Sequence, residues 1–393
     1  MRNLKTLLIL GFVTLAVVFA AYYSRHATEP IPRSGEVLFP GLLDRINEAT
    51  VARITYQGQT TTLERSDGGW RVKEKAGYPA ADEQARELVL GLAQLRRLEP
   101  KTRNPDRYGE LGLDNADSQD AKATHIAVED RNGQTLAALF VGLRRPGKGE
   151  SRLSELFVRL PENPQIWLVE GRLPSATAGK DWLAKAILQL DRQRIRSVTI
   201  THEDGEVIRV ERKAPAALNY QLADLPENAE AASVYAVNSL AAAFADLALD
   251  DVNSAAAVPF TGNPPWSAEL TTFDGLVINM ETARTDADTY ARFSARVDES
   301  LAMKPEPQAE EETASEPEQK PSAPGSALKP LEAVSSEAAA LNARWQGWVY
   351  VLPDYRLSGL AKRKADLLKQ TAAPASQEPE ELPATEESAP EEE

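Results

Sequence analysis

The sequence lacks cysteine altogether and contains only three histidines. The absence of cysteine excludes disulfide bonds, thiolate metal sites and cysteine nucleophiles, but it leaves the redox compartment open. The histidines are His26, His125 and His202, and none has a second histidine at the short spacing of a metal-binding motif. We therefore predict a protein without a metal ion and without any other cofactor.

Basic residues are also outnumbered: 44 Lys and Arg stand against 59 Asp and Glu, which gives a net charge of -15. The acidic excess is concentrated in two segments. Residues 371–393 contain eight Glu and no Lys or Arg, and residues 304–330 contain six Glu and three Lys. Binding of nucleic acid needs a concentrated basic face that neutralises phosphates. The composition therefore argues against nucleic acid as a partner.

One stretch without any charge, Thr6–Ser24, lies near the N-terminus. As a helix it would rise about 28 Å, close to the hydrocarbon thickness of a bilayer. Arg2 and Lys5 precede it, which favours a cytoplasmic N-terminus and a periplasmic remainder at the bacterial inner membrane. A cleaved signal peptide is the alternative, because small residues around Ala20 could serve as a cleavage site. Both interpretations export the rest of the chain.

The exported part contains a pattern that occurs twice, in residues 51–98 and 195–249. Each copy has two β-patterned runs, an aromatic residue after a turn (Trp70 and Tyr220) and an amphipathic helix with an apolar stripe. A hairpin turn follows each helix, at Asn132-Gly133 and at Asp274-Gly275. The steady offset between matching positions is typical of an internal duplication.

The expected fold class is therefore α+β: an N-terminal transmembrane helix followed by two tandem repeats of antiparallel β-hairpins packed with amphipathic helices. We expect the first helix at about 82–98 and the second at about 232–247. The predicted divisions are a membrane anchor (1–24), a tether (25–37), a first α+β repeat (38–192), a second α+β repeat (193–370) and a disordered acidic tail (371–393).

The second repeat contains a stretch rich in Pro, Glu, Ala and Ser that resembles an interdomain linker. In the first repeat, however, the strand at 156–160 is followed by its partner after a short turn. The matching strand at 290–297 finds its expected partner, 347–352, only after this stretch. We therefore predict a disordered insertion, at about residues 300–343, inside a β-hairpin.

Candidate functional residues are few. The neighbouring carboxylates Glu129-Asp130 and Asp250-Asp251 could act in acid–base chemistry, but turns and helix ends commonly use such residues. We assign no catalytic, cofactor-binding or metal-binding residue. A candidate partner surface consists of a basic cluster and an exposed tryptophan pair: Arg96, Arg97, Lys101, Arg103, Arg107, Trp345 and Trp348.

Several short motifs occur in the first repeat: Phe39-Pro40-Gly41-Leu42, Thr62–Arg65, Gly69–Val72, Pro79–Asp82 and Tyr108–Asp114. These motifs resemble those of the DUF4340 family of bacterial envelope proteins. In the last motif this chain has two residues more than the family pattern. The resemblance implies a membrane helix, a duplicated β-rich ectodomain and an association with gliding-type ABC export systems. It implies no catalytic residues.

The sequence thus predicts a single-pass inner-membrane protein that acts without catalysis, as an accessory or scaffold of an ABC-type envelope transport system. Permease or auxiliary subunits are the expected partners. A binding module for an envelope polymer or lipid is the alternative, and a hydrolase that uses carboxylates comes third. The activity, the ligand and the oligomeric state do not follow from the sequence.

Overall fold

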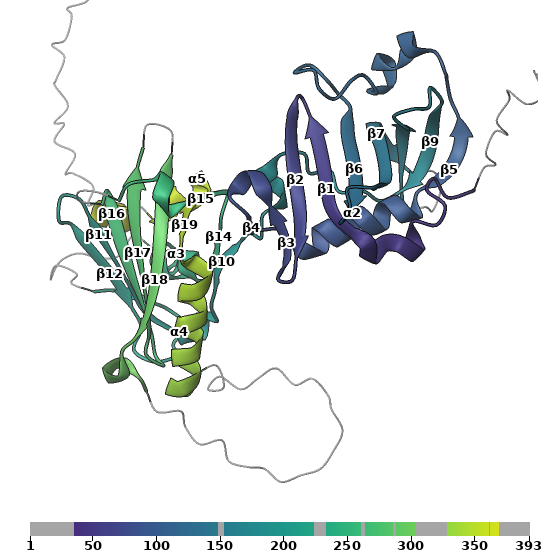
Figure 1. The fold of residues 1–393 in the computed structure, drawn as a ribbon. Helices are drawn as coiled ribbons and strands as arrows, with labels where there is room; N and C mark the ends of the chain where they lie inside the picture. Colours follow the sequence, from purple (N-terminus) through teal and green to yellow (C-terminus); the bar gives the residue numbers. More distant parts are fainter. Residues whose placement is uncertain are drawn as a thin grey trace, which may run out of the picture. The chain divides into compact units, whose positions relative to one another are not determined.

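A computed structural model of the chain describes residues 35–147, 153–223, 233–260, 264–285, 288–303, 328–360 and 362–368. The expected membrane anchor, the expected acidic tail and most of the tether lie outside these residues. Among the residues that are described, no helix is both long and apolar enough to cross a membrane. The described chain has many strands and several helices, and its fold class is α+β (Figure 1).

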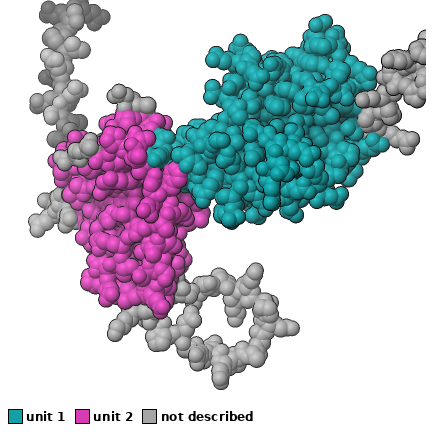
Figure 2. Space-filling model, viewed as in Figure 1, with its two compact units in different colours: residues 1–185, 251–254 teal, residues 186–250, 255–393 magenta. Residues whose placement is uncertain are grey.

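The chain divides into two compact units (Figure 2). Unit 1 comprises residues 1–185 and 251–254, and unit 2 comprises residues 186–250 and 255–393. The first division lies close to the boundary that the repeat pattern indicated, after residue 192.

Unit 1 contains a nine-stranded sheet in the order β4-β3-β2-β1-β6-β7-β8-β9-β5. β1 and β2 pair antiparallel through a turn at Gln57-Gly58, where both residues have positive φ (50° and 74°), as a two-residue hairpin turn requires. The strands are β1 (Ala49–Tyr56), β2 (Gln59–Ser66), β3 (Gly69–Val72), β4 (Tyr78–Pro79), β5 (Arg96–Pro100), β6 (Thr124–Asp130), β7 (Thr135–Pro146), β8 (Ser154–Arg159) and β9 (Ile166–Gly171), with β15 (Asp251–Ser254) also grouped in this unit. The 3-10 helices are η1 (Leu43–Glu48), η2 (Lys73–Lys75), η3 (Pro105–Arg107), η4 (Gly109–Leu111) and η5 (Gly179–Trp182).

The helix of unit 1, α2 (Asp82–Gln94), begins where the sequence predicted. Its buried side chains include Leu88 and Leu92, which form one apolar face. Gly91 also lies on this face. A larger residue would not fit there, because its Cβ atom would come within 2.2 Å of the Arg172 carbonyl oxygen. The helix ends earlier than predicted: residues 96–98 belong to strand β5, which pairs with β9.

The strands of unit 2 follow the order β13-β12-β11-β16-β17-β18-β19, which repeats the order β3-β2-β1-β6-β7-β8-β9 of unit 1 strand for strand. Even an irregularity recurs. The register between β1 and β6 shifts after Ala49, and the register between β11 and β16 shifts after Ile195. A β-bulge at matching places is what a duplicated unit would retain. The predicted repeat is therefore present in the fold.

Unit 2 also contains a small two-stranded sheet, β10-β14. Its strands are β10 (Ala186–Gln189), β11 (Ile195–His202), β12 (Val207–Glu211), β13 (Gln221–Leu222), β14 (Asp246–Ala248), β16 (Trp266–Thr272), β17 (Leu276–Arg284), β18 (Thr289–Val297) and β19 (Trp348–Val351). Its helices are η6 (Arg192–Arg194), α3 (Val234–Ala245), η7 (Ala255–Ala257), η8 (Glu299–Leu301), α4 (Leu331–Trp345), α5 (Asp354–Leu360) and α6 (Lys364–Leu367).

The predicted long hairpin is present, because β18 pairs antiparallel with β19 through Tyr290–Val351 and Ala291–Tyr350. The prediction of disorder up to residue 343 is wrong for residues 331–343, which belong to helix α4. This helix packs along β18 (Figure 1). Its buried residues recur every three or four positions and form one apolar stripe: Val334, Ala338, Leu341 and Trp345. Residues 304–327 of the expected insertion lie outside the described chain.

A buried ionic cluster fixes the start of α4. The guanidinium of Arg194, which is 3% exposed, donates to Asp274 (2.7 and 3.3 Å) and to Glu337 of α4 (2.9 and 2.7 Å). Lys329 adds an ion pair with Glu337 (3.1 Å), and its backbone N–H donates to Asp274 (3.1 Å). One arginine thus connects η6, the β16–β17 turn and the inserted helix. We call these four residues the Arg194 cluster.

We predict that Arg194→Met lowers the free energy of unfolding of unit 2 by about 3–5 kcal/mol, because it leaves the Asp274 carboxylate buried without its cation. The control Glu269→Gln removes an exposed ion pair with Arg296 (3.2 Å) and should cost about 1 kcal/mol or less. Urea unfolding measures both variants. Equally small losses would contradict a role of the Arg194 cluster in fixing α4.

The same cluster should make stability depend on acid pH. Burial alone would raise the pKa of Asp274 and Glu337, but hydrogen bonds and the charge of Arg194 outweigh it, so both pKa values are lowered. As the pH falls, these carboxylates are protonated in the unfolded state before they are protonated in the folded state. The stabilisation is therefore lost as the pH falls through the lowered pKa values of the folded state. We predict that Glu337→Gln loses less stability than the wild type between about pH 5 and about pH 2 in urea titrations. Parallel losses would contradict this.

Candidate functional site

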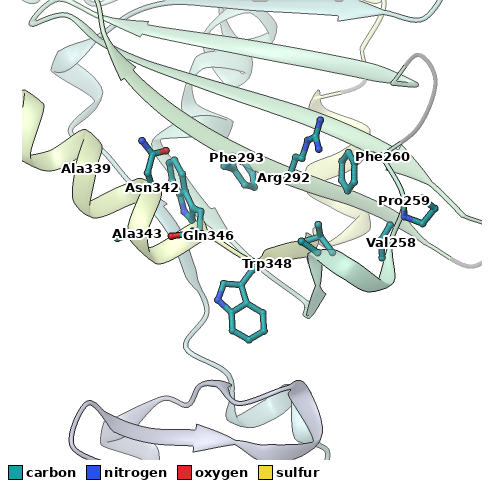
Figure 3. A pocket seen from close by; sticks show the side chains of 14 residues that line it. Val258, Pro259, Phe260, Arg292, Phe293, Ala339, Asn342, Ala343, Gln346 and Trp348 are labelled. Atoms are coloured by element: carbon teal, nitrogen blue, oxygen red, sulfur yellow. The ribbon is translucent and has the colours of Figure 1, made fainter.

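A groove in unit 2 lies between the C-terminal half of α4, strand β18, the first residues of β19 and residues 258–260 after η7. Its volume is about 720 Å³. Figure 3 shows Ala339, Asn342 and Ala343 of α4 on one side and Pro259 and Phe260 on the opposite side. We call it the aromatic groove, because four aromatic side chains line it: Phe260, Phe293, Trp345 and Trp348.

The wall of the groove is fixed by Trp345 at the end of α4. This side chain is 3% exposed, packs against Phe293 with ring centroids 5.5 Å apart, and donates from its indole nitrogen to the carbonyl oxygen of Ile187 (3.1 Å). The guanidinium of Arg344 donates to the same carbonyl. Buried indole groups usually have such a partner. Trp345 is therefore a packing residue that forms the groove rather than a surface residue.

Asn342 connects α4 to the edge of the sheet. Strand β19 pairs with β18 only at Tyr290 and Ala291, so β18 continues without it. At Ala295 the Asn342 side chain takes the place of a strand: it accepts from the Ala295 N–H (2.8 Å) and donates to the Ala295 carbonyl (2.7 Å). Because backbone groups need partners, this contact sets how closely α4 approaches β18 and how wide the groove is.

The rim of the groove carries Trp348, Phe260 and Arg292. Gly347 has a φ of 83°, a conformation that favours glycine, and it turns the chain from α4 into β19 directly before Trp348. The guanidinium of Arg292 lies 4.6 Å from the centre of the Phe260 ring and forms an ion pair with Glu281. Figure 3 shows Trp348 at the edge of the groove, across from Phe293.

These side chains offer apolar ring faces next to the exposed amide of Gln346 and a guanidinium. Rings with neighbouring hydrogen-bonding groups suit the binding of a ligand that has both apolar and polar faces. Among the described residues that line the groove, none is a carboxylate, a histidine or a lysine. The ring faces and the neighbouring polar groups suit the groove to binding.

The expectation of an exposed tryptophan pair is wrong for Trp345. Trp348 is half-buried at the rim, whereas Trp345 is buried beneath it. The structure does bring both residues to the same groove. Sequence reasoning missed Asn342, Gln346, Arg292 and Phe260. The first two lie at positions where disorder was expected or directly after it, and their signal was the apolar spacing of α4.

One member of the predicted basic cluster, Arg97, is buried, whereas the other four are exposed. Arg97 on β5 is 9% exposed: it donates to the carbonyls of Val37 and Leu38 (3.4 and 3.2 Å) and stacks on Trp167. Its neighbour Arg96 points outward, as strand alternation requires. The other three are engaged locally: Lys101 with Glu99, Arg103 with Gln165 (2.8 Å) and Arg107 with Glu110 (3.2 Å).

Unit 1 contains a separate cavity of about 1040 Å³, which Arg103, His125 and Glu129 help to line. His125 stacks on Phe140 (4.6 Å), and burial is the main cause that lowers its pKa, so the imidazole is neutral near pH 7. Glu129 forms an ion pair with Arg53. Glu129 and Arg103 have side-chain partners, whereas the Nε2 atom of His125 is buried without a hydrogen-bond partner among the described residues.

The other candidate residues have structural partners. His202 is buried, with its Nε2 atom 3.0 Å from the carbonyl oxygen of Lys362. Asp130 accepts from the N–H groups of Asn132 and Gln134 (2.8 and 2.9 Å), and these hydrogen bonds lower its pKa. Asp251 accepts from the N–H of Val252 (2.8 Å). Among the described residues, no group of three or more Asp, Glu, His or Cys is placed to bind a metal ion.

Comparison with known proteins gives one match. The model of a family described as a domain of unknown function, DUF4340, matches residues 70–262, which begin in β3 of unit 1 and end after η7 of unit 2. No curated protein and no solved structure matches the chain.

We predict that Asn342→Ala speeds amide hydrogen exchange in β18 around Ala295 and costs about 1–3 kcal/mol of stability, because it leaves a backbone donor and an acceptor without partners. Gln346→Ala, one turn further along the helix axis and exposed, is the matched control and should change stability by less than about 0.5 kcal/mol. Exchange measured by mass spectrometry distinguishes them. Unchanged exchange in Asn342→Ala would contradict the assigned contact.

Proposed function

We propose, on the premise that the chain belongs to the DUF4340 family, that it is a non-enzymatic accessory or scaffold protein of an envelope transport complex. In this proposal residues 6–24 anchor the protein in the inner membrane, the remainder is periplasmic, and the aromatic groove of unit 2 binds a segment of a partner subunit. The observation that carries the proposal is the groove itself, whose lining suits binding.

The chemistry of the groove indicates which kind of segment fits. An apolar or aromatic side chain of the partner could insert between Phe260 and Trp348, where ring contacts each contribute about 0.5–1.5 kcal/mol beyond burial. The exposed Gln346 amide can pair with a backbone N–H or carbonyl of the same segment. Trp, Tyr and Arg are the residue types that dominate binding energy in protein interfaces. The groove presents two of them, Trp348 and Arg292, at its rim.

The groove is also preformed in its walls. Trp345 and Asn342 are each fixed by hydrogen bonds to the surrounding backbone, so little reordering of these groups is needed on binding. Preorganised contacts bind more strongly for the same area, because less conformational entropy is lost. The expected partners are permease or auxiliary subunits of an ABC-type exporter, which is the association that the family resemblance implies.

A second candidate is a binding module for an envelope polymer, and one observation favours it. The rings of Trp348 and Phe260 and the amide of Gln346 line the same groove, and the guanidinium of Arg292 lies over the Phe260 ring. A sugar ring has apolar faces and polar edges, which match a ring flanked by hydrogen-bonding groups.

We predict that a photo-crosslinking amino acid at position 348 in the full chain captures an ABC-transporter subunit in native membranes, because the groove rim would contact it. The same amino acid at position 209, an exposed arginine on β12, is the control and should not capture it. Gln346→Ala should weaken the capture from position 348, since the amide is free to pair with the partner. The products are identified by mass spectrometry.

Two outcomes would contradict the accessory function. Equal capture from positions 348 and 209 would show no specificity for the groove. Capture of no protein, together with loss of binding to isolated envelope polymer in Trp348→Ala, would instead support the polymer-binding function.

A further inference from the structure

Unit 2 contains a second cavity, of about 610 Å³, between helices α3 and α5 and the residues that precede β13. It is separate from the aromatic groove, and the two share none of their lining residues. The residues that matter for its chemistry are Arg192, Arg356, Leu218, Tyr220, Tyr235 and Tyr355. We call it the arginine–tyrosine pocket.

The floor of this pocket is built by Arg212, which is 8% exposed. Its guanidinium donates to the carbonyls of Ile195 (2.8 Å) and Ala217 (3.1 Å) and also to that of Arg192. It lies 5.0 Å from the centre of the Tyr220 ring. All of these contacts are internal, so Arg212 fixes the backbone around the pocket and has little capacity left for a ligand.

Tyr220 forms a neutral wall. Its hydroxyl donates to the Ile195 carbonyl (2.9 Å), and its backbone N–H donates to the side chain of Asn238 on α3 (2.8 Å). Burial raises the pKa of the phenol to about 12, so the ring carries no charge near neutral pH.

Two other guanidiniums in the pocket are available. Among the described residues, neither Arg192 nor Arg356 has a hydrogen-bond or ion-pair partner for its side chain. The Nε atom of Arg356 is buried and unsatisfied, and its guanidinium lies 5.4 Å from the centre of the Tyr355 ring. A buried donor without a partner is costly, and an anion would satisfy it.

The rim of the pocket is apolar and unusually exposed. Leu218 is 90% exposed, Tyr235 is 83% exposed and Tyr355 is 68% exposed. Exposed apolar side chains that line a concave site are typical of a ligand-binding surface. The pocket therefore combines unpaired positive charge with apolar surface.

We propose that the arginine–tyrosine pocket binds an anionic amphiphile, that is, a single phosphate or carboxylate head group on an apolar chain. The head group contacts the guanidiniums of Arg192 and Arg356, and the apolar chain lies against Tyr220 and the rim residues Leu218 and Tyr235. Charge complementarity selects an anion, because these two arginines have no carboxylate partner in the part of the chain that the structure describes. The exposed apolar rim selects a ligand with an apolar body rather than a free inorganic ion.

Calorimetry with the full chain in phosphatidylcholine nanodiscs tests the site. The probes are hexyl phosphate, inorganic phosphate, which lacks the chain, and hexyl glucoside, which lacks the charge. Hexyl phosphate should bind with one site per chain and at least about tenfold more tightly than either of the other two, because only it uses both parts of the pocket. Binding no tighter than that of inorganic phosphate would overturn the proposal.

Variants show which residues contact the head group and which contact the apolar chain. Arg192→Gln and Arg356→Gln should each weaken the binding of hexyl phosphate by at least about fivefold, because a charge-assisted hydrogen bond is lost. Tyr235→Ser should weaken the binding of hexyl phosphate but leave the binding of inorganic phosphate unchanged. The matched control is Arg209→Gln on β12, whose guanidinium pairs with Glu211 (2.8 Å), and it should bind like the wild type. Equal weakening by Arg209→Gln would overturn the proposal, since binding would then follow net charge alone.

Further measurements distinguish a membrane lipid from a free amphiphile as the ligand, and they test whether the aromatic groove or a second copy of the chain is involved. Weaker apparent hexyl phosphate binding in nanodiscs with an anionic lipid identifies a lipid head group as the source, whereas unchanged binding identifies a free amphiphile. Trp348→Ala in the aromatic groove should leave hexyl phosphate binding unchanged. A dimer that Tyr235→Ser dissociates, with no hexyl phosphate binding, would overturn the proposal in favour of a second copy covering the rim.

Discussion

The structure of unit 2 depends on one buried arginine. Arg194 contributes a single positive charge to two carboxylates that come from segments far apart in the sequence, the buried Asp274 and the partly buried Glu337. A buried ion pair contributes little net stability compared with apolar packing, but it is highly specific about position. We therefore infer that the Arg194 cluster fixes the position of α4 on the sheet. Because this helix forms one wall of the aromatic groove, its position also determines the shape of the groove.

Each unit has its own sheet, and the two sheets have a matching strand order. The units differ in the elements attached to these sheets, and the charged residues at matching positions differ as well. The position before the bulge is Glu48 in unit 1 and Arg194 in unit 2, and the matching turns contain Asn132 and Asp274. In unit 1 the turn is stabilised by backbone donors to Asp130, without a buried cation. In the described parts of the two units, a helix lies between β18 and β19 of unit 2, whereas none lies between β8 and β9 of unit 1. The ionic pair and the inserted helix thus occur together in the same repeat.

The sequence predicted those parts of the fold that depend on local chemistry. The hairpin turns at Asn132-Gly133 and Asp274-Gly275 each have a glycine at positive φ, and the start of α2 near residue 82 follows from local signals. The end of α2 was not predictable, because apolar spacing continues to Leu98 while pairing with β9 draws residues 96–100 into a strand. Helix α4 was missed because the composition before it resembles disorder, and its partner Arg194 lies more than a hundred residues away.

In the candidate site, too, features that depend on packing between distant segments could not be predicted from the local sequence. Trp345 and Trp348 were selected together, but they have opposite roles because the helix ends between them and Gly347 turns the chain. Arg96 and Arg97 were also selected together, although strand alternation places one in water and the other in the core. Residue type alone indicated which side chains could bind. Which of them remain accessible was decided by packing, and the arginines of the second cavity gave no local signal at all.

The contact between Asn342 and Ala295 has a consequence for the protein's behaviour among other molecules. A strand that outruns its neighbour exposes unpaired backbone groups, and such an edge is a template on which strands of other chains can add. Asn342 of α4 occupies the backbone N–H and carbonyl of Ala295, beyond the residues of β18 that pair with β19. We therefore expect the inserted helix to hinder the addition of a foreign strand to unit 2 at this position.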